Sequence, residues 1–385
     1  MSALRIFVAH PSGFLTDCKA NGDGLVAYGF LEQLGRRGHE IHVAVERAEI
    51  AQPLPANVVL HHIGDNGRTP RPVFMARMRM LFDRVRRKTQ FDVIHQLNPV
   101  FSGMSLALAG TPVPIVLGTY IGEWPERRAA GLRGRLRQSL SSNVKRGIVA
   151  LQQSQAQALL VTTPAALSRV PQATRLVDRI YMLPNGIDTN HFSPSAEQDR
   201  ERAIVSLCGL AERKGAQILL DAFGIVARSF PDVVLRIGGG AAAEDIARAR
   251  AHLGDVAARV SFVGPVSRSS LPEFLRSGSV FCMPSLGEPY GMAALEAMAV
   301  GLPIVCSDGG GLTHLVADGG GIRIREGSVE ECATALLAML SDGDARRRFG
   351  TFNRKRALEE FAWPKVIERL ESVYLRVMEG CKRRS

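Results

Sequence analysis

Two glutamates, Glu288 and Glu296, enclose a seven-residue stretch that leads from a loop into a helix. The loop follows a short apolar run at residues 280–283, and Gly291 opens the predicted helix. A helix N-terminus binds phosphate well because it offers unpaired backbone N–H groups and the positive end of the helix dipole. Glu296 would lie about one and a half turns inside the helix, within reach of a ribose diol beside a bound diphosphate. The spacing indicates a nucleotide site; the alternative is a solvated loop acid and an ordinary helix acid.

A pair of cations forms a second candidate site. Arg213 and Lys214 lie in the segment CGLAERKG, between a strand predicted at residues 203–208 and a helix. A cation at a strand end can neutralise a diphosphate as it becomes a leaving group, in the place of a divalent metal. We therefore expect neither a metal nor another cofactor. A solvated Lys-Gly loop is the alternative.

Short β-branched runs alternate with helical patterns along the whole chain. The predicted strands are residues 4–9, 41–45, 58–62, 93–95, 115–117, 159–162 and 180–183, then 203–208, 233–237, 260–263, 280–283 and 303–306. Such units predict doubly wound α/β sheets of parallel strands, in which ligands bind beyond the carboxyl ends of the strands. His95 and Tyr120 follow two of these strands and are candidate ligand contacts, with hydrogen-bonded structural residues as the alternative.

The middle of the chain carries a domain boundary. Pro184 and an Asn-Gly pair interrupt the pattern, and a polar linker precedes the next series of strands. We predict one Rossmann-like domain over residues 1–185, a second over residues 186–360 and a final helix over residues 361–385 that returns to the first. A cleft is expected between the two domains.

Composition restricts the class of protein. The chain has 385 residues, of which 46% are hydrophobic, and no apolar run reaches the ~18 residues of a membrane span. Its six cysteines lie far apart, which favours a cytoplasmic protein without disulfides or zinc. Residues 1–185 hold 23 basic and 12 acidic residues, and residues 186–385 hold 25 of each. The net charge of +11 therefore belongs to the first half, which indicates a polyanionic partner.

Two segments concentrate the basic residues. Residues 71–88 contain seven Lys or Arg and one acid, with apolar residues at helical spacing, and residues 127–146 contain seven and no acid. A basic amphipathic helix suits an anionic membrane surface, and a core-facing helix with solvated arginines is the alternative. We expect no nucleic-acid binding, because no recognition motif accompanies the arginines.

The motif GEPYGMAALEAMAVGLPIV, with NGID and HFSP near residues 185–194 and RKG at residues 213–215, resembles the retaining glycosyltransferases of family 4. The resemblance covers nearly the whole chain and implies the GT-B fold, with the acceptor on the first domain and a nucleotide-sugar on the second. It implies that Glu288 contacts the transferred sugar and Glu296 the nucleotide ribose. The neighbouring residues would surround the sugar and phosphate: Tyr290, Gly291, Met292 and Leu295.

The remaining family positions match unevenly. Lys214 corresponds to the family lysine, whereas Leu210 stands where an arginine belongs, and Arg213 is the candidate replacement. Gly22 corresponds to a glycine that lets the backbone approach the donor phosphate. Tyr120 stands where many relatives carry a histidine that contacts the sugar, so His95 and His10 are the candidate substitutes.

Together these features predict a metal-independent retaining glycosyltransferase. The donor would be a nucleoside-diphosphate sugar, with UDP favoured over GDP. The acceptor hydroxyl would belong to a membrane-associated glycolipid or polysaccharide precursor, with the enzyme peripheral on the cytoplasmic face. The alternatives are a soluble small-molecule acceptor and a non-catalytic nucleotide-sugar-binding protein.

Overall fold

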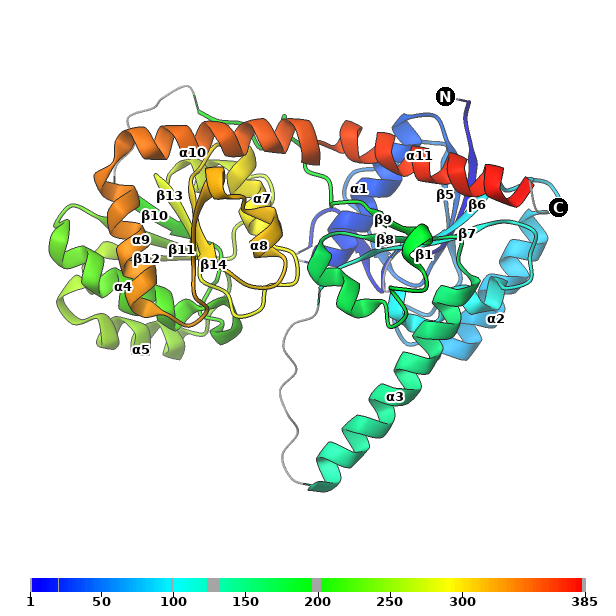
Figure 1. The fold of residues 1–385 in the computed structure, drawn as a ribbon, viewed down its shortest axis with the longest axis horizontal. Helices are drawn as coiled ribbons and strands as arrows, with labels where there is room; N and C mark the ends of the chain where they lie inside the picture. Colours follow the sequence, from blue (N-terminus) through cyan, green and yellow to red (C-terminus); the bar gives the residue numbers. More distant parts are fainter. Residues whose placement is uncertain (1, 20, 98–99, 123–131, 196–201, 383–385) are drawn as a thin grey trace. The chain divides into compact units, whose positions relative to one another are not determined.

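The computed structural model describes residues 2–19, 21–97, 100–122, 132–195 and 202–382. The chain divides into two compact units (Figure 1). Unit 1 comprises residues 1–121, 126–186 and 363–385, and unit 2 comprises residues 122–125 and 187–362. Among the described residues, no helix is both long and apolar enough to cross a bilayer.

Unit 1 is built on a seven-stranded parallel sheet in the order β5-β3-β1-β6-β7-β8-β9. Its strands are β1 (Arg5–His10), β3 (Glu40–Val45), β5 (Val58–His62), β6 (Val93–Gln96), β7 (Ile115–Tyr120), β8 (Ala158–Val161) and β9 (Ile180–Met182). A short pair, β2 (Leu15–Thr16) and β4 (Ala48–Glu49), lies beside it. The inner strands β1, β6, β7 and β8 are buried along almost their whole length, as expected where helices cover both faces of a parallel sheet.

The central strand β1 shows how both faces are filled. Ile6 and Val8 pack with α1 (Gly22–Arg36) and α11 (Trp363–Lys382), whereas Phe7 and Ala9 pack with α2 (Arg71–Val85). Successive strand residues point to opposite faces, so a continuous apolar run serves two cores. The long helix α3 (Leu132–Gln155) precedes β8, and its first turns extend away from the sheet (Figure 1).

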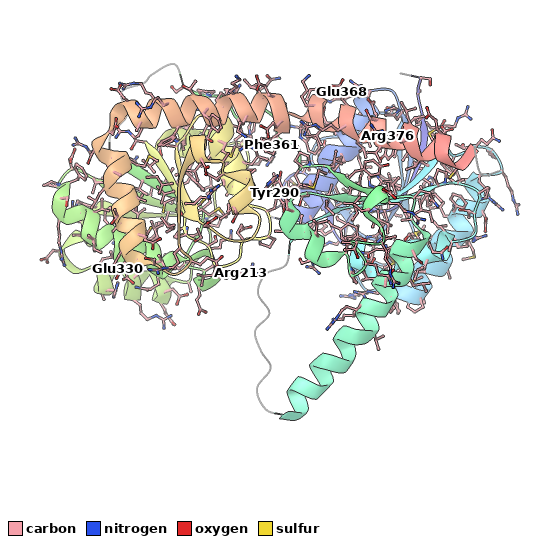
Figure 2. All side chains as sticks on the ribbon, in the orientation of Figure 1. Arg213, Tyr290, Glu330, Phe361, Glu368 and Arg376 are labelled. Atoms are coloured by element: carbon pink, nitrogen blue, oxygen red, sulfur yellow. The ribbon has the colours of Figure 1, made fainter. Side chains whose placement is uncertain are left out.

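The C-terminal helix α11 belongs to unit 1, although it is last in the chain. Its buried residues recur every three or four positions, while Glu368 and Arg376 are exposed on it (Figure 2). Glu371 is buried on the inner face and accepts hydrogen bonds from Arg37 (Nε to Oε1, 2.9 Å) and His39 (Nε2 to Oε1, 2.8 Å). This ionic cluster ties the helix to the turn after α1.

Unit 2 is built on a six-stranded parallel sheet in the order β12-β11-β10-β13-β14-β15. Its strands are β10 (Ala203–Ser206), β11 (Val234–Gly238), β12 (Val260–Gly264), β13 (Val280–Met283), β14 (Ile304–Ser307) and β15 (Gly321–Ile324). Its helices are α4 (Ala216–Ser229), α5 (Ala243–Leu253), α6 (Leu271–Arg276), α7 (Met292–Ala299), α8 (Leu312–Leu315), α9 (Val329–Ser341) and α10 (Gly343–Arg356). Two parallel sheets with helices between the strands confirm the predicted doubly wound α/β class.

Candidate functional site

The two candidate loops of unit 2 follow neighbouring strands. β10 pairs with β13, so their carboxyl ends meet at the same edge of the sheet. The turn after β10 carries Arg213 and Lys214, and the loop after β13 carries Glu288. The Leu286 backbone N–H donates to the Arg213 carbonyl oxygen at 2.8 Å, which joins the loops directly. Two segments about 75 residues apart in the sequence thereby form one site.

Glu288 is a half-buried carboxylate with an unsatisfied oxygen. Its Oε2 atom is buried and has no hydrogen-bond partner among the described residues. Burial raises the pKa of Glu288, while the cations Lys214 and Arg213 and backbone N–H groups of Tyr290 and Gly291 oppose that rise. A buried acceptor without a partner is costly unless a ligand supplies a donor. A sugar hydroxyl would supply one.

The backbone beneath Glu288 is held from two sides. The Gly311 N–H donates to the Glu288 carbonyl oxygen at 2.7 Å, and Glu326 Oε1 accepts from the Gly287 N–H at 2.7 Å. Gly310, at φ +58°, lies so close that an added Cβ would stand 2.2 Å from the Glu288 carbonyl oxygen. The loop conformation therefore depends on the glycines after β14.

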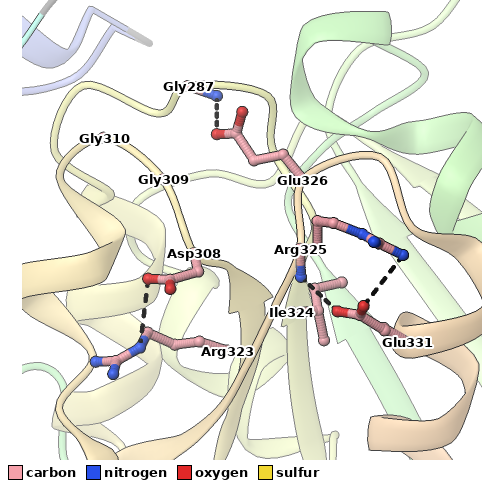
Figure 3. A pocket seen from close by; sticks show the side chains of 9 residues that line it. All are labelled: Gly287, Asp308, Gly309, Gly310, Arg323, Ile324, Arg325, Glu326 and Glu331. Carbon is pink, nitrogen blue, oxygen red and sulfur yellow. Dashed lines mark hydrogen bonds and ion pairs between the residues drawn. The ribbon is translucent and has the colours of Figure 1, made fainter.

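A pocket of about 740 Å³ opens beside Gly287 (Figure 3). Its charged residues pair with one another, Arg323 with Asp308 at 3.4 Å and Arg325 with Glu331 at 3.3 Å. None of the residues predicted for the site lines it. We therefore do not take this pocket as the binding site. Its lining residues Gly287 and Glu326 instead support the loop that carries Glu288.

Helix α7 begins at Met292 behind the N-cap residue Gly291, whose φ of +99° is favourable for glycine. Gly291 itself has no side chain to cap the helix, and Leu295 lies in the first turn and is buried. Glu296, in the second turn, is only 7% exposed, and its Oε1 accepts from Arg268 Nη1 at 3.3 Å. Burial raises the pKa of Glu296 to about 7, against the opposing charges of Arg268 and Lys214.

Lys214 is electrostatically coupled to both glutamates. Its Nζ donates to the Leu207 carbonyl oxygen at 3.3 Å, which directs the ammonium back toward the end of β10. Arg213 is exposed, and Figure 2 labels it on unit 2 together with Tyr290, which is buried. The site thus combines two cations, two carboxyls of raised pKa and a helix N-terminus. That combination suits an anionic ligand that also carries hydroxyl groups.

Gly22, the candidate of unit 1, is the first residue of α1. The preceding Asn21 caps the helix, since its Oδ1 accepts from the Gly24 N–H at 2.9 Å. Among the described residues, and apart from its chain neighbours and the helix backbone, no atom lies within 4 Å of the position a Gly22 Cβ would take. Close packing among the described residues therefore does not require glycine here, and the ligand contact of Gly22 stays a prediction.

His95 and Tyr120 lie in the interior of unit 1, each 1% exposed. His95 Nδ1 pairs with the Tyr374 hydroxyl at 2.6 Å and its Nε2 donates to the Gly118 carbonyl oxygen at 2.9 Å. Burial lowers the pKa of His95 to about 4. The Tyr120 hydroxyl accepts from Gln153 Nε2 at 3.3 Å. The structure thus favours the structural alternative for His95, whose two ring nitrogens both have partners, and it places Tyr120 in the interior of unit 1.

Sequence reasoning missed two residues of the site. Arg268 follows β12 and pairs with Glu296, and Glu326 follows β15 and holds Gly287. Both lie in polar loops without a motif, so only the three-dimensional structure identifies them. Among the described residues, no group of three or more His, Cys, Asp or Glu is arranged to hold a metal ion.

Family models match most of the chain. Residues 188–356 match "Glycosyl transferases group 1", and residues 20–191 match "Glycosyltransferase Family 4". An alpha-maltose-1-phosphate synthase of Mycolicibacterium smegmatis is 33% identical over 229 residues, 52% of this chain and 57% of that protein. A phosphatidyl-myo-inositol mannosyltransferase of Mycobacterium tuberculosis is 31% identical over 219 residues, 54% of this chain and 57% of that protein. The chain thus spans little more than half the length of these relatives.

Solved structures of low sequence identity share the fold. A sucrose-phosphate synthase from Thermosynechococcus elongatus superposes with a TM-score of 0.72 at 20% identity, covering 99% of this chain and 100% of that chain. Anabaena HepE in complex with UDP gives a TM-score of 0.72 at 17% identity, with 96% and 98% covered. These comparisons confirm the GT-B fold and the family predicted from the motifs. The chain belongs to the group 1 and family 4 glycosyltransferases.

Proposed function

We propose that this protein transfers a sugar from a nucleoside-diphosphate sugar to an acceptor hydroxyl, with retention of anomeric configuration and without a metal ion. The observation that carries the proposal is the unsatisfied buried oxygen of Glu288, a residue that precedes the α7 N-terminus and whose pKa is lowered by the charge of Lys214 against the effect of burial. A sugar hydroxyl would satisfy that oxygen, while the attached diphosphate would meet the cations and the helix end.

Each residue of the site would have a distinct role. Glu288 would accept a hydrogen bond from the transferred sugar, and Glu296 would accept from the ribose. Lys214 and Arg213 would neutralise the diphosphate. The backbone around Tyr290, Gly291, Met292 and Leu295 would enclose the sugar and phosphate, and Gly22 would approach the donor phosphate.

The reaction would proceed on one face of the sugar. The bond from the anomeric carbon to the diphosphate oxygen breaks, and the bond to the acceptor oxygen forms on the same side. The acceptor proton passes to the departing phosphate oxygen, so charge is balanced without an enzymic nucleophile. Lys214 would stabilise the negative charge that develops on the leaving diphosphate.

UDP is the proposed nucleotide. HepE, which shares the fold, has been solved with UDP bound. A thermal-shift panel of UDP, GDP and ADP tests the choice, because a ligand at 100 times its Kd stabilises a protein by ~2.7 kcal/mol. UDP should give the largest shift, and a larger shift with GDP or ADP would reject the assignment.

Release of nucleoside diphosphate distinguishes catalysis from binding. Incubation with UDP-sugars and a membrane lipid extract should liberate UDP and label the lipid fraction. Label in a water-soluble product would instead favour the soluble acceptor. Donor binding without release of UDP or transfer to either fraction would favour the non-catalytic alternative.

The acceptor is proposed to lie at an anionic membrane surface that contacts α3 of unit 1. Helix α3 contains five basic residues and no acid, and Val144, Ile148 and Leu151 are 62%, 42% and 54% exposed on it. Exposed apolar residues on a basic helix suit binding in the plane of an anionic bilayer. The first part of the basic segment 127–146 lies outside the described residues.

Helix α2 carries the other basic segment, but most of its apolar residues are buried in the core of unit 1. Phe74, Met78, Leu81 and Phe82 are buried in the core of unit 1. Two of its arginines pair with acids, Arg77 with Asp65 at 3.3 Å and Arg79 with Asp83 at 2.7 Å. The core-facing alternative therefore describes α2, and we assign membrane contact to α3 alone.

Liposome sedimentation tests this surface. The protein should sediment with vesicles that contain anionic phosphatidylglycerol and remain free of phosphatidylcholine vesicles. Leu151→Gln should weaken the binding several-fold, while the control Leu167→Gln, at a residue 36% exposed on the 3₁₀ turn Pro164–Arg169, should not. Failure to sediment with the phosphatidylglycerol vesicles would remove the membrane from the proposal, and equal binding to both vesicle types would remove its preference for anionic lipid.

A further inference from the structure

Glu296 is a buried carboxyl that pairs with an arginine from a loop 28 residues earlier in the sequence. It lies on α7, and Arg268 reaches it from the segment between β12 and α6 with an Nη1 to Oε1 distance of 3.3 Å. A buried carboxylate needs a positively charged partner to stay ionised, so this contact favours the ionised form of Glu296. The one other charged group that acts on Glu296 is Lys214, from the turn after β10, within the described part of the chain.

Arg268 is fixed from both ends. Its backbone carbonyl oxygen accepts from His191 Nε2 at 3.0 Å, and its guanidinium lies 5.4 Å from the centre of the Phe192 ring. Phe192 is fully buried, and its own carbonyl oxygen accepts from Arg354 Nη1 at 2.8 Å. His191 and Phe192, which contact Arg268, are therefore held against the interior of unit 2.

The charge of Glu296 depends on this neighbour. Burial raises its pKa to about 7, and Arg268 is the largest opposing influence. An ionised carboxylate accepts two hydroxyl protons, as a ribose diol requires, whereas a protonated carboxyl has less acceptor capacity. Removing Arg268 would raise the pKa of Glu296 further and protonate it at neutral pH.

We propose that Arg268 is a positioning residue of the nucleotide site, which favours the ionised form of Glu296 and orients its carboxylate toward the ribose diol. The inference rests on the proposed function, since it takes the ribose as the ligand of Glu296. It adds a residue that no motif identifies. Arg268 acts through the carboxylate and need not touch the nucleotide.

Calorimetric titration with UDP between pH 6 and pH 8.5 tests the inference. In the wild type, affinity should increase with pH as Glu296 ionises. Arg268→Gln should lower affinity about tenfold at pH 7 and less at pH 8.5, because the titration moves to higher pH. Arg268→Lys should restore most of the loss, because it returns the positive charge. Since UDP itself titrates in this range, each variant is compared with the wild type at the same pH.

Two further measurements separate this effect from general damage. Arg276→Gln is the matched control, because Arg276 donates to the Ser193 carbonyl oxygen at 3.1 Å and no ion pair with Glu296 involves it. Its pH profile should match the wild type. The ratio of affinities for UDP and 2′-deoxy-UDP should fall in Arg268→Gln as it does in Glu296→Gln, since both variants weaken the ribose contact.

The outcomes distinguish this inference from the proposed function. If Glu296→Gln binds UDP as the wild type does, the ribose assignment of the proposed function fails. If Glu296→Gln is weak but Arg268→Gln keeps the wild-type pH profile, only the role of Arg268 fails. An equal loss at every pH that Arg268→Lys does not restore also overturns that role.

Discussion

Gly310→Ala should impair sugar transfer because it displaces the neighbouring loop that carries Glu288. An added Cβ would stand 2.2 Å from the Glu288 carbonyl oxygen, well inside the 3.4–4 Å of an ordinary contact. The loop that carries Glu288 must therefore move by about 1 Å, a misplacement that can cost about 100-fold in rate. That factor corresponds to about 2.7 kcal/mol in the activation free energy.

A second glycine separates this displacement from backbone strain. Gly327 has a φ of +82°, and apart from its chain neighbours no atom in the described part of the chain lies within 4 Å of the position its Cβ would take. Both substitutions force an alanine into the left-handed region, at about 1–2 kcal/mol each. Only Gly310→Ala also displaces Glu288.

Steady-state kinetics and UDP titration measure the two effects. Gly310→Ala should lower kcat about 100-fold relative to Gly327→Ala, with UDP affinity within about threefold because Glu296 and Lys214 stay in place. A kcat equal to that of Gly327→Ala would refute the claim that the position of Glu288 limits transfer.

Three other perturbations have defined outcomes. Lys214→Ala should weaken UDP binding about tenfold or more by calorimetry, because a charge-assisted contact to the diphosphate is lost; unchanged affinity would remove Lys214 from the phosphate site. Glu371→Gln should lower the free energy of unfolding by about 2–3 kcal/mol in urea titrations, because Arg37 and His39 lose their charged partner; a loss below about 0.5 kcal/mol would show that the cluster contributes little. Arg37 and His39 hold the pKa of Glu371 below its usual 4.5 against the opposing effect of burial, so its stabilisation is present above that pH and lost as the pH falls below it. Glu371→Gln should remove that part of the acid dependence, and an unchanged pH profile would contradict the assignment.

Local patterns were sufficient to predict most of the fold. Strands such as β10 and β13 are short apolar runs between helices, and that pattern determines a doubly wound sheet. The sequence analysis missed β15, whose residues Gly321–Ile324 alternate small or charged residues with isoleucine at the edge of the sheet. An edge strand packs less apolar surface, so its pattern is weaker.

The site was less predictable, because it depends on contacts between distant segments. Motif spacing identified Glu288 and Lys214, but the unsatisfied Oε2 follows from the folded loop. Arg268 reaches Glu296 from 28 residues away in the sequence, with no periodicity to indicate it. For His95 the sequence suggested a ligand contact, but in the folded chain the residue is hydrogen-bonded to Tyr374 from the C-terminal helix.

Glu288 is proposed to contact the transferred sugar and not the nucleotide. The most direct test measures UDP affinity and sugar transfer in the same preparation of Glu288→Ala. We predict UDP affinity close to that of the wild type, with transfer reduced by at least 100-fold, about 2.7 kcal/mol or more in activation free energy. Near-normal transfer by Glu288→Ala, with its fold intact by circular dichroism, would contradict this role of Glu288.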